Sequence, residues 1–452
     1  MQSINPANGE LIAEYKAMGE AELREIVARA AEAQRAWASA GFLLRSRALQ
    51  AAASLLRSQA QEFARLMALE MGKPVTAGAA EAEKSAWGCE FYAENAEELL
   101  ADEMVDSAAS RSLVRYQPLG ALLAIMPWNF PFWQVFRAAA PSLMAGNAVL
   151  LKHSSNVSGC ALAIEKIFHQ AGVPRDVFRT LLTGSDRIPA LIDDPRIAAV
   201  TLTGSEAAGR SVGMAAGKAL KPSVLELGGS DPFIVLPDAD IARTAQQAAI
   251  ARTQNSGQSC IAAKRFMVTE PVYDAFSEAF RGVMAKLRVG DPLDPATEVG
   301  PQARRELRDE LHGQVEDSIK AGARLTLGGE KPEGPGAWYP PTVLEDVTPG
   351  MRAFDEEVFG PVAAVIRVKD AGDAVRLANR SSFGLGASIW TANPENAEGA
   401  IDDLECGMVF VNDFVRSDPR LPFGGVKASG YGRELAAQGI RAFTNLKTIW
   451  VR

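Results

Sequence analysis

The sequence is poor in the residues that build metal centres and disulfide frameworks. It has four cysteines and three histidines in 452 residues, and no two cysteines form a CxxC pair. Because zinc sites and secreted disulfide scaffolds need closely spaced ligands, we expect a metal-free protein with reduced thiols. The few, dispersed histidines also argue against a His-based catalytic triad: His153, His169 and His312.

Long apolar runs and basic clusters are missing as well. No apolar stretch approaches the roughly 18 residues of a membrane span, and the opening MQSINPANGE lacks the basic and apolar regions of a secretion signal. The net charge of −8 and the absence of a Lys/Arg block argue against nucleic acid as a partner. We therefore expect a cytoplasmic protein that binds neither membrane nor nucleic acid.

The composition, with 47% hydrophobic and 23% charged residues, is that of a globular protein. A chain of 452 residues exceeds the size of a single core, which stops growing near about 250 to 300 residues, so we expect two large domains. Residues 20–100 are alanine-rich with helical periodicity and predict three helices.

Short apolar runs then alternate with helical patterns in two blocks, an order that predicts parallel sheets with crossover helices. The first block holds ALLAIM, NAVLLK, DVFRTLL, IAAVTLTG and SVLELGG, and the second holds PFIVL, RFMVT and AAVIRV. A Gly pair at 228–229 marks the boundary between two α/β domains. SLVRYQ at 112–117 and the C-terminal TNLKTIWVR alternate like exposed strands, and we predict that they build an intersubunit sheet.

Cys260 is the cysteine best placed for chemistry. It lies in QNSGQSC, a polar, Gly-containing loop between a helical pattern and the strand-like RFMVT. Most free cysteines are small buried hydrophobes, an interpretation that fits Cys89, Cys160 and Cys406. Loops are where nucleophiles are displayed, so Cys260 is the candidate nucleophile, with a thiol pKa that a catalytic site must control.

Two further polar residues follow apolar strands. Glu226, in VLELGG, is either half of a satisfied ion pair or a general base. Asn129, in MPWNFPF, either caps a helix that opens at Pro131 or points its amide at a developing oxyanion, and the residue alone favours the cap.

One segment has the general arrangement of a phosphate site. AVTLTGSEAAG (199–209) has the strand, Gly turn and helix start that bind phosphate, although no GxGxxG opens a helix in this chain.

Taken together, these segments resemble the aldehyde dehydrogenase superfamily over nearly the whole chain. The motifs that carry the resemblance are PWNFP (127–131), LTGS (202–205), LELGG (225–229), GQSC (257–260), EEVFGP (356–361) and PFGGVKASGYGRE (422–434). The resemblance implies an α/β fold of two Rossmann-like domains with parallel sheets and a small β extension for oligomerisation, in a homodimer or homotetramer. It assigns 1–105 and 119–228 to cofactor binding, 229–421 to catalysis, and 106–118 and 435–452 to oligomerisation.

The resemblance also implies roles for the three candidates. Cys260 attacks the aldehyde carbonyl, and Asn129 with the Cys260 backbone N–H forms the oxyanion hole. Glu226 activates the water that hydrolyses the resulting thioester. A carboxylate at this position favours release of a free acid over transfer to coenzyme A. Many relatives carry a lysine implicated in proton relay where this chain has Ala138, so the route by which Glu226 loses its proton is left open.

The implied cofactor is NAD or NADP. Glu357 and Phe359 match the residues that hold the nicotinamide ribose, Lys152 matches the lysine on the adenosine ribose, and Ser205 matches the serine at the pyrophosphate. Ser155 replaces a glutamate that would repel a 2′-phosphate, so NADP is tolerated and both cofactors stay open. The full set expected at the cofactor is Trp128, Lys152, Ser155, Gly204, Ser205, Leu227, Glu357 and Phe359.

Within the superfamily the chain resembles the shorter bacterial succinate-semialdehyde dehydrogenases, through KHSSN, LELGGSDPF, CIAAKRF and GPVAAV. Arg137 lies eight residues after Asn129, about two helical turns along the same face, and can grip a distal carboxylate. Its alternative role is a surface or intersubunit salt bridge. The expected substrate residues are Arg137, Trp133, Ser417 and Phe423, with Arg416 and Arg420 as further candidates.

Three functions are therefore weighed. The first is oxidation of succinate semialdehyde to succinate, and the second is oxidation of a broader or different range of aldehydes with Arg137 used structurally. The third is a noncatalytic binding or structural protein on the same fold. Joint retention of five residues argues against the third: Cys260, Glu226, Asn129, Lys152 and Glu357.

Overall fold

The computed structural model describes all residues, 1–452. The chain begins with a β-hairpin followed by four helices. The hairpin pairs β1 (Gln2–Ile4) with β2 (Leu11–Glu14), and the helices are α1 (Glu20–Ser39), α2 (Gly41–Ser58), α3 (Ala60–Met71) and α4 (Val75–Leu99). The prediction of three helices is wrong. A single residue separates α1 from α2 and α2 from α3, so the two turns leave no loop signal in the sequence.

A six-stranded sheet follows, in the order β19-β9-β8-β5-β6-β7. Its five main strands are parallel, as predicted: β5 (Ala121–Met126), β6 (Ala148–His153), β7 (Phe178–Thr180), β8 (Ile197–Thr203) and β9 (Ser223–Glu226). The edge strand β19 (Gly430–Tyr431) is antiparallel to β9, so the C-terminal motif returns to this sheet. The helices between these strands are α5 (Trp133–Met144), α6 (Ser158–Gln170), α7 (Ile188–Asp193) and α8 (Glu206–Lys218).

A seven-stranded sheet forms the second half, in the order β12-β13-β14-β11-β10-β16-β17. Only β12 (Arg324–Leu327) is antiparallel to its neighbour, and the others are β10 (Pro232–Val235), β11 (Arg265–Thr269), β13 (Thr342–Glu345), β14 (Val362–Val368), β16 (Gly386–Trp390) and β17 (Met408–Val411). The helices are α9 (Ile241–Thr253), α10 (Tyr273–Met284), α11 (Arg305–Lys320), α12 (Arg352–Asp355), α13 (Ala371–Ala378) and α14 (Glu398–Asp403). A short pair joins β15 (Phe383–Gly384) to β18 (Val426–Lys427).

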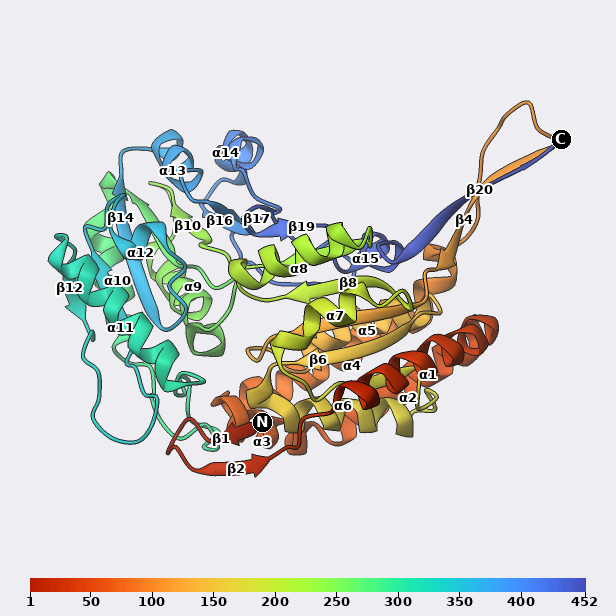
Figure 1. Cartoon of the computed structure of the whole chain (residues 1–452). Coiled ribbons are helices and arrows are strands. Elements are labelled where there is room, and N and C mark those ends of the chain that lie inside the picture. Colours follow the sequence, from red (N-terminus) through yellow and green to blue (C-terminus); the bar gives the residue numbers. More distant parts are fainter.

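The two segments predicted to be exposed strands pair with each other. β20 (Thr444–Val451) runs antiparallel to β4 (Arg111–Pro118) along its whole length, with β3 (Glu103–Met104) on the other side of β4. This ribbon follows the short helix α15 (Ala436–Arg441) and projects away from the body of the molecule (Figure 1). Whether it also joins a second subunit stays a prediction.

Buried apolar side chains form one large core around the first sheet and separate cores on the second. The large core packs α1 to α6 against the six-stranded sheet. Along β10, Phe233 and Val235 belong to one core while Ile234 belongs to another. Because alternate strand residues point to opposite faces, both faces of the seven-stranded sheet are covered. None of the helices combines the length and apolar character needed to cross a bilayer.

Candidate active site

Cys260 follows an unusual turn after α9. Asn255, Ser256 and Gly257 have φ values of 53°, 57° and 76°, so three consecutive residues are left-handed. Such backbone costs energy for residues other than glycine and persists only where the surroundings enforce it. At Gly257 a side chain is also excluded, since a Cβ would overlap the carbonyl of Gly360. The loop that carries the sulfur is therefore held in a fixed shape.

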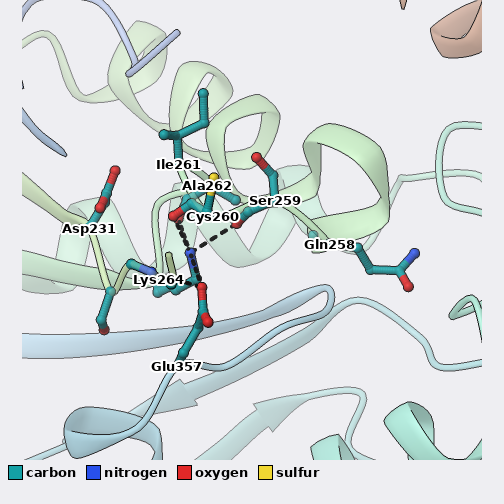
Figure 2. A network of polar contacts seen from close by, with 12 residues as sticks. Asp231, Gln258, Ser259, Cys260, Ile261, Ala262, Lys264 and Glu357 are labelled. Carbon is teal, nitrogen blue, oxygen red and sulfur yellow. Dashed lines mark hydrogen bonds and ion pairs between the residues drawn. The ribbon is translucent and has the colours of Figure 1, made fainter. Parts of the chain in front are cut away.

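One buried cation, Lys264, holds this loop in place (Figure 2). The Lys264 ammonium donates to the backbone oxygens of Ser259 (2.9 Å), Cys260 (2.8 Å) and Ala262 (3.1 Å), and lies 3.7 Å from Glu357. Burial lowers the pKa of Lys264, and the nearby Glu357 opposes that shift. Lys264 was not predicted as a site residue, although it stands in the CIAAKRF motif, because only the fold brings its ammonium close to the loop.

The Cys260 thiol is neutral in this environment. Burial raises the pKa of Cys260 to about 12, while the positive charges of Arg137 and Lys264 oppose the rise. The thiolate is the reactive form of cysteine. Deprotonation must therefore accompany attack on a substrate, and a base within reach is required.

Asn129 lies beside Cys260 and does not cap a helix. α5 begins at Trp133, and the carboxylate of Glu81 accepts from the backbone N–H groups of Phe132 (2.8 Å) and Trp133 (3.0 Å) at its start. The cap interpretation of Asn129 and the helix start at Pro131 are both wrong, because Glu81 of α4 already satisfies these donors.

The Asn129 amide is instead oriented toward the loop that carries Cys260. Its Nδ2 donates to the Gln258 carbonyl (3.1 Å), and its Oδ1 accepts from Gln134 Nε2 (3.1 Å). An amide nitrogen carries two hydrogens, so one remains for another acceptor. Asn129 and Cys260 line the same cleft, which places that second donor near the sulfur.

Glu226 ends β9 and is buried, with no hydrogen-bond partner for either carboxylate oxygen. Burial raises its pKa well above the usual range, the charge of Glu434 raises it further, and Arg137 and Arg433 oppose the rise. Its side chain packs against Gly424, where a Cβ would come within 2.5 Å of Oε1. In this conformation Glu226 does not line the cavities at Cys260.

Arg137 is paired inside the chain. Its Nε forms a buried ion pair with Glu434, and its Nη2 donates to Thr203 Oγ1 (3.3 Å). Because Asn129 precedes α5, the two residues do not share a helix face, and that step of the sequence argument is wrong. Glu434 is the last residue of the PFGGVKASGYGRE motif, yet its pairing across almost 300 residues was not visible in the sequence.

A cleft of about 470 Å³ opens on one side of Cys260. Its lining includes most of the residues expected at the cofactor: Trp128, Gly204, Ser205, Leu227, Glu357 and Phe359. Ser205 caps α8, whose first-turn N–H groups suit a pyrophosphate. Glu357 is fixed by the Gly229 N–H (2.9 Å) and can accept from ribose hydroxyls. The donor and acceptor set fits a nicotinamide dinucleotide.

The two residues expected at the adenosine end lie outside this cleft. Lys152 is in β6, and Ser155 lines a neighbouring cavity of about 390 Å³. Arg304 lines both the cleft and that cavity, so the two spaces adjoin.

A second cavity of about 270 Å³ reaches Cys260 from α4, α5 and the loop before β18. It brings together the four expected substrate residues: Trp133, Arg137, Ser417 and Phe423. Trp133 Nε1 donates to Ser417 Oγ (3.0 Å), and the Arg137 guanidinium lies 4.4 Å from the Phe423 ring. Arg416 also lines the cavity, whereas Arg420 pairs with Asp418 and does not.

Comparison with known proteins agrees over the full chain. The sequence pattern of the aldehyde dehydrogenase family matches residues 1–449. The protein named succinate-semialdehyde dehydrogenase (NADP(+)) 1 of Mycobacterium bovis is 51% identical over 452 residues, covering 99% of each chain.

Solved structures agree as well. The structure of Gox0499 has a TM-score of 0.98 at 40% identity, covering 100% of this chain and 99% of that one. Succinic semialdehyde dehydrogenase from Streptococcus pyogenes, in complex with NADP+, has a TM-score of 0.97 at 34% identity with the same coverage. On the match of the family pattern over residues 1–449 and the 51% identity over 99% of the chain, the protein belongs to the aldehyde dehydrogenase family.

Proposed function

We propose that the protein oxidises succinate semialdehyde to succinate with reduction of NADP+ or NAD+, through a thiohemiacetal and then a thioester on Cys260. The observation that carries this proposal is the position of Cys260 in the lining of two cavities. One fits a dinucleotide, and the other is small and lined by cations. Cofactor and aldehyde can therefore approach the same sulfur from separate openings.

In the proposed reaction the Cys260 thiol gives its proton to a water molecule in the cleft, and its sulfur bonds to the carbonyl carbon of the aldehyde. The carbonyl oxygen gains negative charge, and the free Asn129 amide hydrogen and the Cys260 backbone N–H stabilise it. The chemistry that a bound nicotinamide supplies is acceptance of the hydride from the former aldehyde carbon. The product of this half-reaction is a Cys260 thioester.

Hydrolysis of the thioester requires a general base, and we assign this role to Glu226. Its carboxylate turns from Gly424 toward the sulfur, takes a proton from water, and the resulting hydroxide attacks the acyl carbon. The C–S bond breaks, the carboxylic acid leaves, and the Cys260 thiolate takes the proton from Glu226, which restores both the thiol and the base. The raised pKa of Glu226 makes it a stronger base than an exposed carboxylate, and Arg137 offsets part of that rise.

The substrate assignment has two supports. The second cavity, at about 270 Å³, lies at the small end of ligand pockets and suits a short aldehyde. Cationic side chains in its lining favour a substrate with a distal carboxylate. A relative 51% identical over 99% of its length carries the name succinate-semialdehyde dehydrogenase.

For the cofactor, we propose that Ser155 admits the 2′-phosphate of NADP, with Lys152 and Arg304 as the nearby cations. The same relative is named for NADP(+). A Ser155→Glu variant should lose most of its kcat/KM with NADP+ through like-charge repulsion and keep it with NAD+. An equal loss with both cofactors would contradict the placement of the 2′-phosphate at Ser155.

We also propose that the protein is a homo-oligomer and that different segments of each chain have different roles. Residues 1–105 and 119–228 bind the cofactor, 229–421 carry the nucleophile, and 106–118 with 435–452 join subunits. Exposed apolar side chains on the projecting ribbon support the last assignment: Met104, Leu446, Trp450 and Val451. Sedimentation should find a dimer or tetramer, and removal of 444–452 should yield smaller species.

The direct test of function is NAD(P)H absorbance with succinate semialdehyde and with butanal, a neutral aldehyde of equal length. A kcat/KM at least tenfold higher for succinate semialdehyde supports the proposed substrate. Equal values would instead support the broader aldehyde specificity weighed above.

A further inference from the structure

Four cationic side chains line the second cavity, and three of them already have a carboxylate partner. Lys73 pairs with Glu81, Arg137 with Glu434, and Arg416 with Asp413. The fourth is Lys84. No carboxylate oxygen lies within ion-pair distance of its ammonium, and it donates no hydrogen bond within the chain. Lys84 is thus the cation of this cavity that is free to bind an anion.

Lys84 occupies a poor environment for an unpaired charge. It is half-buried on α4, one turn beyond Glu81, with its ammonium 5.0 Å from the centre of the Trp133 ring. Burial, which is the largest cause, and the charge of Arg137 bring the pKa of Lys84 down to about 8. Glu81 and Asp418 oppose that shift, while Arg416 adds to it. An anion in the cavity would relieve both the lost hydration and the repulsion between cations.

Arg137 is less able to play this part. To bind a substrate carboxylate through its Nε it would have to release Glu434, which is buried and lies near the uncompensated Glu226. Leaving a buried carboxylate without its partner is strongly unfavourable. Arg137 contributes positive potential to the cavity, but its ion pair is already formed.

We propose that Lys84 binds the distal carboxylate of the substrate and thereby determines the preference for carboxylated aldehydes. This inference rests on the proposed function, because it presumes that the second cavity receives the semialdehyde. In the complex, the substrate carboxylate forms an ion pair with the Lys84 ammonium while the aldehyde carbon lies at Cys260. Trp133 forms the wall between them and packs against the methylene groups.

The test compares Lys84→Met and Lys84→Arg with wild type, using succinate semialdehyde and butanal. Loss of a charged contact should lower the ratio of the two kcat/KM values about tenfold to a hundredfold in Lys84→Met, chiefly through KM for the semialdehyde. Lys84→Arg should keep most of the ratio. The control is Lys286→Met, which removes one positive charge from an exposed lysine just after the end of α10, and it should leave the ratio unchanged.

The pH profile gives an independent readout. In wild type, KM for succinate semialdehyde should rise above about pH 8 as the ammonium loses its proton, relative to KM for butanal. In Lys84→Arg this relative rise should disappear, because a guanidinium stays charged.

The outcomes separate this inference from the proposed function. If wild type does not prefer succinate semialdehyde over butanal, the proposed function fails and the inference fails with it. If wild type shows the preference and Lys84→Met keeps it within twofold, the inference alone is overturned. If kcat/KM in Lys84→Met falls equally for both aldehydes, Lys84 has a structural role and the inference is also overturned.

Discussion

Replacing Arg137 with methionine should damage the enzyme toward every aldehyde. The guanidinium is 4% exposed and is the counter-ion of Glu434, which is also 4% exposed. It also opposes the rise in pKa of both Glu226 and Cys260. Methionine fills a similar volume but leaves Glu434 without its ion-pair partner and leaves Arg433 as the remaining cation near Glu226.

Breaking a buried ion pair on one side costs about 3 to 5 kcal/mol. For a large domain this corresponds to a fall in Tm of roughly 6 to 10 °C, at about 2 °C per kcal/mol. The pKa of Glu434 is already raised by burial and should rise further in the variant. A carboxyl group with a raised folded-state pKa binds its proton more tightly when folded, so it lowers stability as pH increases. The deficit should therefore be larger at pH 9 than at pH 6.

The assay is thermal unfolding of Arg137→Met, Glu434→Gln and the double variant, with kinetics on succinate semialdehyde and butanal. The double variant should be more stable than Arg137→Met, because both charges of the pair are gone. Both aldehydes should lose activity in Arg137→Met. A Tm within 2 °C of wild type, or a loss confined to carboxylated aldehydes, would refute this reasoning and return Arg137 to the role of a substrate ligand.

Three further predictions concern the nucleophile and its surroundings. Asn129→Ala should lower kcat by roughly 10² to 10³ if its second amide hydrogen meets the oxyanion, and steady-state kinetics showing less than a tenfold loss would argue against that contact. Gly257→Ala should abolish activity or folding, since its φ of 76° and the Gly360 carbonyl exclude a side chain; an active, stable variant would show that the turn tolerates one. Turnover of butanal should increase with pH between 6 and 9, because burial raises the pKa of Cys260 to about 12 and raises that of Glu226 above its usual range, so the basic forms of both groups gain population as pH rises; a flat profile would mean that neither group limits the rate.

The sequence predicted the α/β class and most elements that carry site residues. The strand patterns in IAAVTLTG and SVLELGG are confirmed as β8 and β9, which end next to one another at Thr203 and Glu226. The helix count failed because one-residue turns leave no gap in the periodicity. β16 and β17 were not predicted, since runs of four or five apolar residues are ambiguous between strand and helix.

The partners of the charged residues could not be predicted. Arg137 and Glu434 pair because β19 returns to the edge of the first sheet. No local sequence pattern predicts this long-range strand pairing. The absence of a partner at Lys84 is equally a property of the folded chain. Lys84 has the same sequence signature as an ordinary surface lysine on a helix, and only the packing of Trp133 and Arg137 around it sets it apart.

The proposed mechanism requires that Cys260 becomes acylated and that Glu226 acts as the base for hydrolytic release of the acyl group. Glu226→Gln should still produce one equivalent of NAD(P)H in a burst and then stall, because the thioester lacks its base. Mass spectrometry of this variant, quenched after mixing with succinate semialdehyde and cofactor, should find a succinyl adduct on the peptide that contains Cys260. An unmodified peptide after a full burst would contradict the account.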